Sequence, residues 1–262
     1  MDASQEKQGE IISLYKELGE TPLECLERWR KEHPEHTKTK LSYLGRLDPM
    51  AEGLMLIAVG EENKKREEYL GLDKTYEFEI LFGFETDTDD VLGLAKVKAL
   101  PEILKDDTLL MKRLEEECKL LVGNFKKPYP AYSSRTVEGK PLWQWAREGR
   151  LGEIKVPENE TTVMSLECLD VREIPTIEVQ VEIGRRVGLV EGDFRQSEIL
   201  LQWFQAFESS KEASYYVASC KIDCSSGTYV RQIIHEIGDR LGSGATAWKI
   251  KRIRVGEHSL LF

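Results

Sequence analysis

The sequence predicts an α+β fold, with a largely antiparallel mixed sheet and helices packed on it. Several segments alternate apolar and polar residues with the period of a strand. Most of these segments follow one another without the regular crossover helices of a parallel sheet, and helical segments lie among them. The chain has 262 residues, which is enough for one domain with a substantial core. We expect residues 1–9 to be disordered and residues 10–262 to form that domain.

Helix and strand signals are both clear in the first half of the chain. Thr21 and Glu24 form a capping box with Pro22 at the first helical position, which predicts a helix that ends near His33. Residues 74–82 alternate strictly, which predicts a half-buried strand. The other elements expected here are a buried strand at residues 54–59 and a charged helix at residues 61–70.

In the second half, residues 176–183 alternate clearly. Ile177, Val179, Val181 and Ile183 are all β-branched and occupy every second position, which predicts a strand with these side chains facing inward. The other strands are expected at residues 161–171, 213–223 and 248–256. Helices are expected at residues 101–121, 141–147, 194–207 and 228–241.

Composition limits the classes of function. The formal net charge of -10 argues against a surface that binds nucleic acid everywhere, so any RNA binding must use local patches. Basic residues gather within residues 28–46, 126–140 and 249–254, although each cluster alone is more typical of a solvated face. The cysteines are odd in number and lack the spacing of a zinc site, which suits free thiols in a reducing cytosol. No export signal or membrane-spanning run is visible, so we expect a cytoplasmic protein without a membrane partner.

The segment around Asp48 joins a basic region to a buried strand. Pro49 biases Asp48 toward an extended backbone, and Gly45 and Gly53 permit tight turns on either side. An isolated Asp-Pro pair more often only caps a turn. In this setting, however, the carboxylate is expected to sit in a stiff loop at the mouth of a strand.

Arg231 is expected in the first turn of a helix. The positive end of the helix dipole disfavours a cation there, so an anion that faces Arg231 would offset the cost. Asp48 or an RNA phosphate would serve.

Taken together, these motifs resemble the TruB family of tRNA pseudouridine synthases from about Lys16 to Gly256. Each motif alone is weak, but six of them in the family's order form a specific pattern. They lie at residues 45–54, 73–76, 86–93, 130–133, 139–149 and 224–245.

The resemblance implies roles for individual residues. It implies that Asp48 is the essential catalytic carboxylate, that Tyr76 stacks on the target uracil and that Arg231 positions Asp48. It also implies that Tyr229 and Ile250 line the pocket. The reaction breaks the bond from N1 to C1' of uridine and rejoins C1' to C5, and the family performs it without a metal or redox cofactor. Asp48 would either attack C1' as a nucleophile or remove the proton at C2' as a base.

Three positions depart from the family's pattern. Tyr43 stands where the family has His, Lys16 is followed by Glu17 rather than Pro, and the basic residue after Tyr132 is shifted to Arg135. We count Tyr43, Lys16 and Arg135 as substrate-binding residues at an altered RNA-contacting rim.

The resemblance also implies a partner, the T-arm of tRNA, with the uridine at tRNA position 55 as the leading target. The family's small C-terminal RNA-binding (PUA) domain has no counterpart within these 262 residues. Residues 126–150 are therefore expected to clamp the RNA like the family's thumb, in a protein that acts as a monomer.

Two alternative functions stay open. One is a pseudouridine synthase for another tRNA or rRNA uridine, and the other is an RNA-binding chaperone without catalysis. A glycoside hydrolase would need a second facing carboxylate, and none is evident near Asp48.

Overall fold

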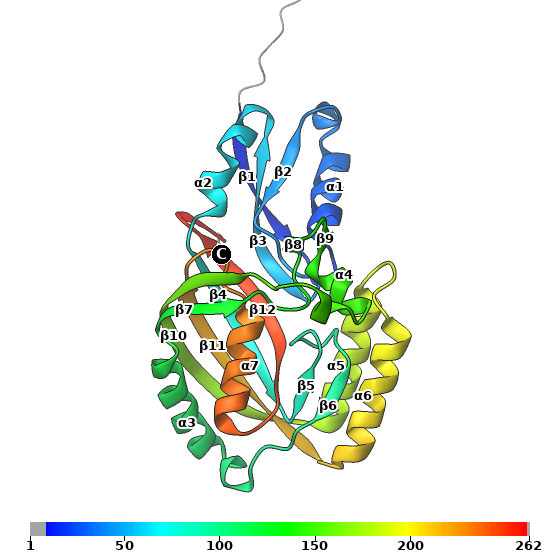
Figure 1. Cartoon of the computed structure of the whole chain (residues 1–262), viewed down its shortest axis with the longest axis vertical. Coiled ribbons are helices and arrows are strands. Elements are labelled where there is room, and N and C mark those ends of the chain that lie inside the picture. Colours follow the sequence, from blue (N-terminus) through cyan, green and yellow to red (C-terminus); the bar gives the residue numbers. More distant parts are fainter. Residues whose placement is uncertain (1–8, 261–262) are drawn as a thin grey trace, which may run out of the picture.

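The computed structural model describes residues 9–260, so residues 1–8 of the predicted disordered segment lie outside it. One large sheet runs through the molecule in the order β1-β3-β12-β4-β11-β10-β7, with β2 paired to β3 and β13 to β12 (Figure 1). Every neighbouring pair is antiparallel except β12 and β3, which are parallel. The predicted α+β class and the largely antiparallel mixed sheet are confirmed.

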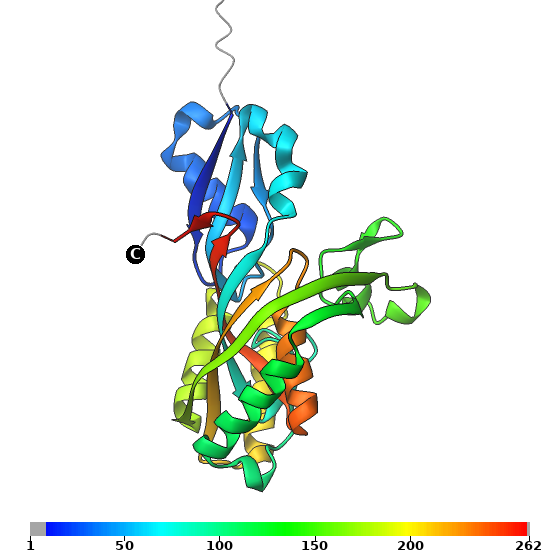
Figure 2. The same ribbon diagram turned by 90° about the vertical axis from the view of Figure 1, so that its left-hand side faces the viewer.

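The sheet connects three regions, which Figures 1 and 2 show from two sides. An upper lobe carries one end of the sheet, a lower body carries the rest, and an arm leans out from the body. The lobe consists of β1 (Glu10–Lys16), α1 (Pro22–Glu32), β2 (Leu41–Leu44), β3 (Ala51–Val59), the 3-10 turn η2 (Gly60–Lys65) and α2 (Arg66–Leu70). The arm is carried by β7 (Gly123–Pro128) and the first part of β10 (Glu158–Pro175), and it includes β8 (Thr136–Val137), β9 (Lys140–Pro141) and α4 (Leu142–Arg147).

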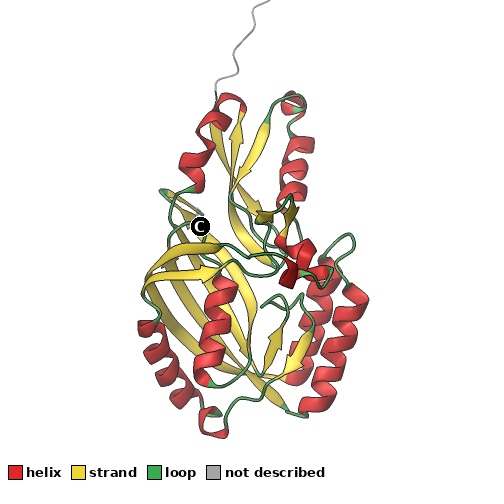
Figure 3. Cartoon of the chain, in the orientation of Figure 1, coloured by secondary structure: helices red, strands yellow, loops and turns green. Residues whose placement is uncertain are grey.

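The body packs helices on both faces of the sheet, as Figure 3 shows by element type. Its strands are β4 (Lys74–Phe82), β11 (Ser214–Cys224) and β12 (Ala245–Val255), with a small hairpin of β5 (Phe84–Thr86) and β6 (Ala95–Val97). Its helices are α3 (Asp107–Leu120), α5 (Thr176–Leu189), α6 (Gln196–Ser210) and α7 (Val230–Leu241). Helices α3 and α7 lie on one face and α5 on the other (Figure 2). Short elements complete the chain: η1 (Pro34–His36), η3 (Glu102–Leu104), η4 (Leu151–Glu153) and β13 (His258–Ser259).

The strand predicted at residues 176–183 is wrong, because this segment is the first half of helix α5. In the helix, Val179, Ile183 and Val187 recur at the helical spacing of four and are buried against the sheet. Ile177 and Val181, which the strand prediction placed inward, are 63% and 65% exposed. The alternating apolar residues fit both periods, and packing overrode the weak preference of β-branched residues for strands.

Other predicted elements are confirmed with shifted ends. The capping box of α1 is present, since Thr21 Oγ1 accepts from the Glu24 N–H and the Glu24 carboxylate accepts from the Thr21 N–H. The helix expected at residues 61–70 is divided into η2 and α2, and the one expected at residues 101–121 begins as η3. Within residues 9–260, none of the helices combines the length and the apolar character needed to cross a bilayer.

Candidate active site

A cavity of about 570 Å³ opens where lobe, body and arm meet. Its lining is strongly positive although the whole chain has a net charge of -10. The lining includes one acidic residue, Asp48, and six basic residues, which are Arg46, Arg66, Lys74, Arg135, Arg231 and Arg252. A polyanion is therefore the kind of ligand that this cavity favours.

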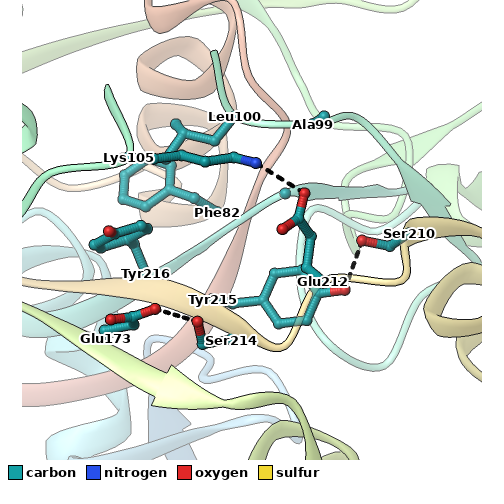
Figure 4. Close-up of a pocket in the computed structure, with 11 residues that line it drawn as sticks. Phe82, Ala99, Leu100, Lys105, Glu173, Ser210, Glu212, Ser214, Tyr215 and Tyr216 are labelled. Carbon is teal, nitrogen blue, oxygen red and sulfur yellow. Dashed lines mark hydrogen bonds and ion pairs between the residues drawn. The ribbon is translucent and has the colours of Figure 1, made fainter. Parts of the chain in front are cut away.

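A smaller cavity of about 260 Å³ lies at the opposite end of β4 and β11 (Figure 4). Its polar groups already satisfy one another. Lys105 Nζ is 2.9 Å from Glu212 Oε1, and the Tyr215 hydroxyl donates to Ser210 Oγ at 2.7 Å. No comparable set of charged groups is left there to bind a ligand, so the positive cavity is the better candidate.

Asp48 lies in a loop whose backbone is held from several directions. The Ala51 N–H donates to the Asp48 carbonyl at 2.9 Å, and the Gly19 N–H donates to the Pro49 carbonyl at 2.8 Å. Gly53 has a φ of +112°, and a Cβ there would lie 2.3 Å from the Arg252 carbonyl oxygen. The stiff loop expected from the sequence is therefore present, and Gly53 is needed for the close approach of β3 to β12.

The side chain of Arg231 fixes the Asp48 carboxylate. Arg231 Nε donates to Asp48 Oδ2 at 2.8 Å, and the two other guanidinium nitrogens donate to the carbonyls of Thr88 and Tyr132. Arg231 is only 3% exposed, so its donors face protein groups rather than an RNA phosphate. The sequence left open whether Arg231 faces Asp48 or an RNA phosphate, and in the structure it faces Asp48. Asp48 Oδ1 accepts no hydrogen bond from residues 9–260, and the carboxyl side chain is 42% exposed.

A second carboxylate lies behind this pair. Asp90 Oδ2 is 3.6 Å from Arg231 Nε, and Asp90 is buried. Burial raises the pKa of Asp90 to about 6, with Arg231 opposing the shift and the nearby Asp48 adding to it. Arg231 is thus enclosed by two carboxylates, of which only Asp48 is open to the cavity.

Aromatic and apolar side chains complete the floor. Tyr76 is on β4, Tyr229 precedes α7 and Ile250 is on β12, and all three line the cavity as expected. Burial raises the pKa of Tyr76, and burial together with Asp48 raises the pKa of Tyr229, so both hydroxyls stay protonated at neutral pH.

Two buried cations in the floor were not foreseen from the sequence. Arg252 is 1% exposed and donates to the carbonyls of Leu54, Arg46 and Gly45, so it ties β12 to the Asp48 loop. Lys74 Nζ donates to the carbonyls of Leu70 and Leu72. Burial, with Arg252 adding to it, lowers the pKa of Lys74 to about 8. Neither cation has a carboxylate within 4.0 Å among the described residues. The only sequence signal for Arg252 was its place in the basic run at residues 249–254.

The residues predicted to bind substrate divide into two groups. Tyr43 and Arg135 line the cavity, and the Arg135 guanidinium lies 5.3 Å from the centre of the Tyr129 ring. Lys16 is fully buried and is not part of the lining. Its Nζ donates to the Ala51 carbonyl at 2.6 Å, so it supports the Asp48 loop from behind.

Residues 126–150 of the arm are expected to clamp the RNA, and most of their basic side chains form ion pairs within the protein. Residues 126–150 contain six cations, and five form ion pairs with described carboxylates. These five are Lys126, Lys127, Lys140, Arg147 and Arg150. Only Arg135 has no such partner, and it is the one that lines the cavity.

Comparisons with known proteins agree with this architecture. Residues 33–188 match the sequence model described as TruB family pseudouridylate synthase, N-terminal domain. The chain is 28% identical over 251 residues to tRNA pseudouridine synthase B of Fusobacterium nucleatum, covering 95% of this chain and 69% of the relative. It is 29% identical over 265 aligned positions to tRNA pseudouridine synthase 4 of Saccharomyces cerevisiae, covering 86% of this chain and 62% of the relative. The fold is similar to a chain in the crystal structure of a Cbf5-Nop10-Gar1 complex, with a TM-score of 0.55 and 18% identity over 95% of this chain and 49% of that one.

Proposed function

Because this chain belongs to the TruB family of pseudouridylate synthases, we propose that it isomerises uridine to pseudouridine in tRNA. The observation that carries the proposal is the Asp48–Arg231 pair at the floor of a cavity whose other charged lining residues are all cations. The cations suit a polyanionic RNA, and the carboxylate is the reactive group that the sugar requires.

The contacts of Asp48 suit it to act on the ribose. Arg231 holds one carboxylate oxygen, which leaves Oδ1 directed to no described protein group. That oxygen either attacks C1' or takes the proton at C2', and in both cases the bond from N1 to C1' breaks. The released uracil must then turn so that C5 meets C1'. The ring of Tyr76 provides a flat surface against which the base is held while it turns.

The target that we propose is the uridine at position 55 of the T-loop of tRNA. A stacked nucleotide cannot reach Asp48 at the floor of the cavity, so the uridine is flipped out at a cost of about a few kcal/mol. We also propose that the protein acts on this target as a monomer. The chain spans between 54% and 69% of the length of three of the curated relatives that it matches.

The test is incubation of the purified protein with unmodified tRNA transcript and mapping of pseudouridine along the product. We expect modification at position 55. Modification at a different uridine would replace the target while keeping the chemistry. Tight tRNA binding without any pseudouridine would instead favour a chaperone, and a host strain that lacks the protein would show which target is lost in cells.

A further inference from the structure

We propose that Arg66, on the lobe, binds a backbone phosphate of the RNA, opposite Arg135 on the arm. This inference rests on the proposed function and assigns a second anchor for the same substrate. It concerns the wall of the cavity rather than its reactive floor.

The first observation is the orientation of α2. Arg66 and Leu70 are four residues apart, so they share one helical face, and both line the cavity. The two other cations of this segment do not line it. Lys64 pairs with Glu61, and Lys65 Nζ lies 3.0 Å from Glu62 Oε1. As in the arm, the cation that lines the cavity is the one without an ion pair.

The second observation is an unsatisfied donor. Arg66 Nε is enclosed by protein yet has no hydrogen-bond partner among residues 9–260. Arg66 also forms no ion pair with a described carboxylate, although Glu67 and Glu68 follow it directly. The described protein groups therefore neither neutralise nor hydrogen-bond this side chain, which leaves the charge of Arg66 available to an anion in the cavity.

The third observation is the placement of Arg66 and Arg135. The lobe carries Arg66 and the arm carries Arg135, and Figure 2 shows the arm leaning out from the body below α2. Both side chains line the cavity that has Asp48 on its floor. A nucleotide that enters with its ribose toward Asp48 carries one phosphate on each side of the sugar. Arginine matches phosphate oxygens with two parallel N–H donors, so each wall would hold one phosphate.

The experiment compares Arg66→Gln with Lys65→Gln, which removes the same charge from a paired, exposed residue of the same segment. Binding of a T-arm RNA is measured over a range of salt concentrations. We expect Arg66→Gln to lower the slope of log affinity against log salt by about 0.7–0.9, the value for one phosphate contact, and Lys65→Gln to leave it unchanged. Arg66→Lys should restore most of the slope. An unchanged slope in Arg66→Gln, or an equal loss in Lys65→Gln, would overturn the inference.

RNAs with single neutral methylphosphonate linkages identify the phosphate. A neutral linkage at the phosphate that Arg66 contacts should weaken RNA binding by the wild type but not by Arg66→Gln. A neutral linkage at a different phosphate, the one that Arg135 contacts, should weaken RNA binding by the wild type but not by Arg135→Gln. If every linkage weakens both proteins equally, Arg66 contacts no single phosphate. Equal thermal unfolding midpoints exclude misfolding. If the wild type binds RNA but forms no pseudouridine, the proposed function fails. Even then, a smaller slope of log affinity against log salt in Arg66→Gln would still assign Arg66 to a phosphate.

Discussion

The floor and the walls of the cavity are built in opposite ways. On the floor, Arg231 and Arg252 are almost completely buried, and each makes three hydrogen bonds to protein groups. On the walls, Arg66 and Arg135 have no ion pair with a described residue. A fixed floor suits chemistry, because reacting groups must be held in place before the substrate arrives. Unpaired walls suit binding, because their charges are free to meet an incoming anion.

The largest effect is expected at the floor, from Asp48→Asn. The change keeps the shape and an acceptor for Arg231, but it removes the nucleophile or base. Pseudouridine formation should fall by about 10²–10⁴-fold or more, while tRNA affinity stays within a few fold. Single-turnover assays and equilibrium binding measure the two quantities. Multiple turnover by a clean preparation of the variant would show that the floor does not carry the chemistry.

Arg231→Lys should separate positioning from phosphate binding. A lysine cannot hold Asp48 and the two carbonyls at once, so we expect the activation barrier to rise by about 1.5–3 kcal/mol. The salt dependence of tRNA binding should not change, because Arg231 does not face the RNA. Near-normal turnover by Arg231→Lys, or a reduced salt slope in Arg231→Ala, would move this residue from the floor to the walls.

Tyr76→Leu should slow the reaction and leave the fold intact, since Leu fills a buried apolar position on β4. Lost stacking is expected to raise the barrier by about 1–3 kcal/mol. A much larger loss in single-turnover rate would indicate that the hydroxyl also takes part, for example in proton removal from C5. An unchanged rate would remove Tyr76 from the site.

The smallest effect concerns Lys74, the second of the two buried cations in the floor. Its pKa is lowered to about 8, so the ammonium is charged below pH 8 and neutral above it. RNA affinity should therefore decline slightly from pH 7 to pH 9, together with the salt slope. Lys74→Gln should bind at pH 7 like the wild type at pH 9 and lose most of this pH dependence. If the variant keeps the full pH dependence, Lys74 does not contribute to the potential of the cavity.

The sequence predicted the floor better than the walls. Asp48 and Arg231 stand in local motifs that the resemblance orders, so their contact could be expected and is seen at 2.8 Å. Arg66 could not be chosen over Lys64 and Lys65, because only the fold decides which cation turns toward the cavity. For the same reason Lys16 was expected at the substrate but lies behind the Asp48 loop.

The secondary structure was predictable where the spacing of apolar residues fitted only a helix or only a strand. The strand β4 and the capped helix α1 follow from local patterns that only one structure satisfies. The segment at residues 176–183 fits two periods, and only the contact of Val179 and Ile183 with the sheet decides for the helix. The strands β1 and β2 were not predicted from the sequence, and in the structure both pair with β3.

The position of β12 also determines when the site can form during synthesis. This strand lies between β3 and β4, although most of the chain separates it from β3. Until the ribosome has made residues 245–255, the lobe has no neighbour on that side and Arg252 is missing beneath the Asp48 loop. Such distant pairings are slow to form, because the entropy of closing a long loop is lost before any contact compensates for it. We therefore expect the nascent chain to hold Asp48 in an unfinished site, and RNA modification to begin only after this strand has been inserted.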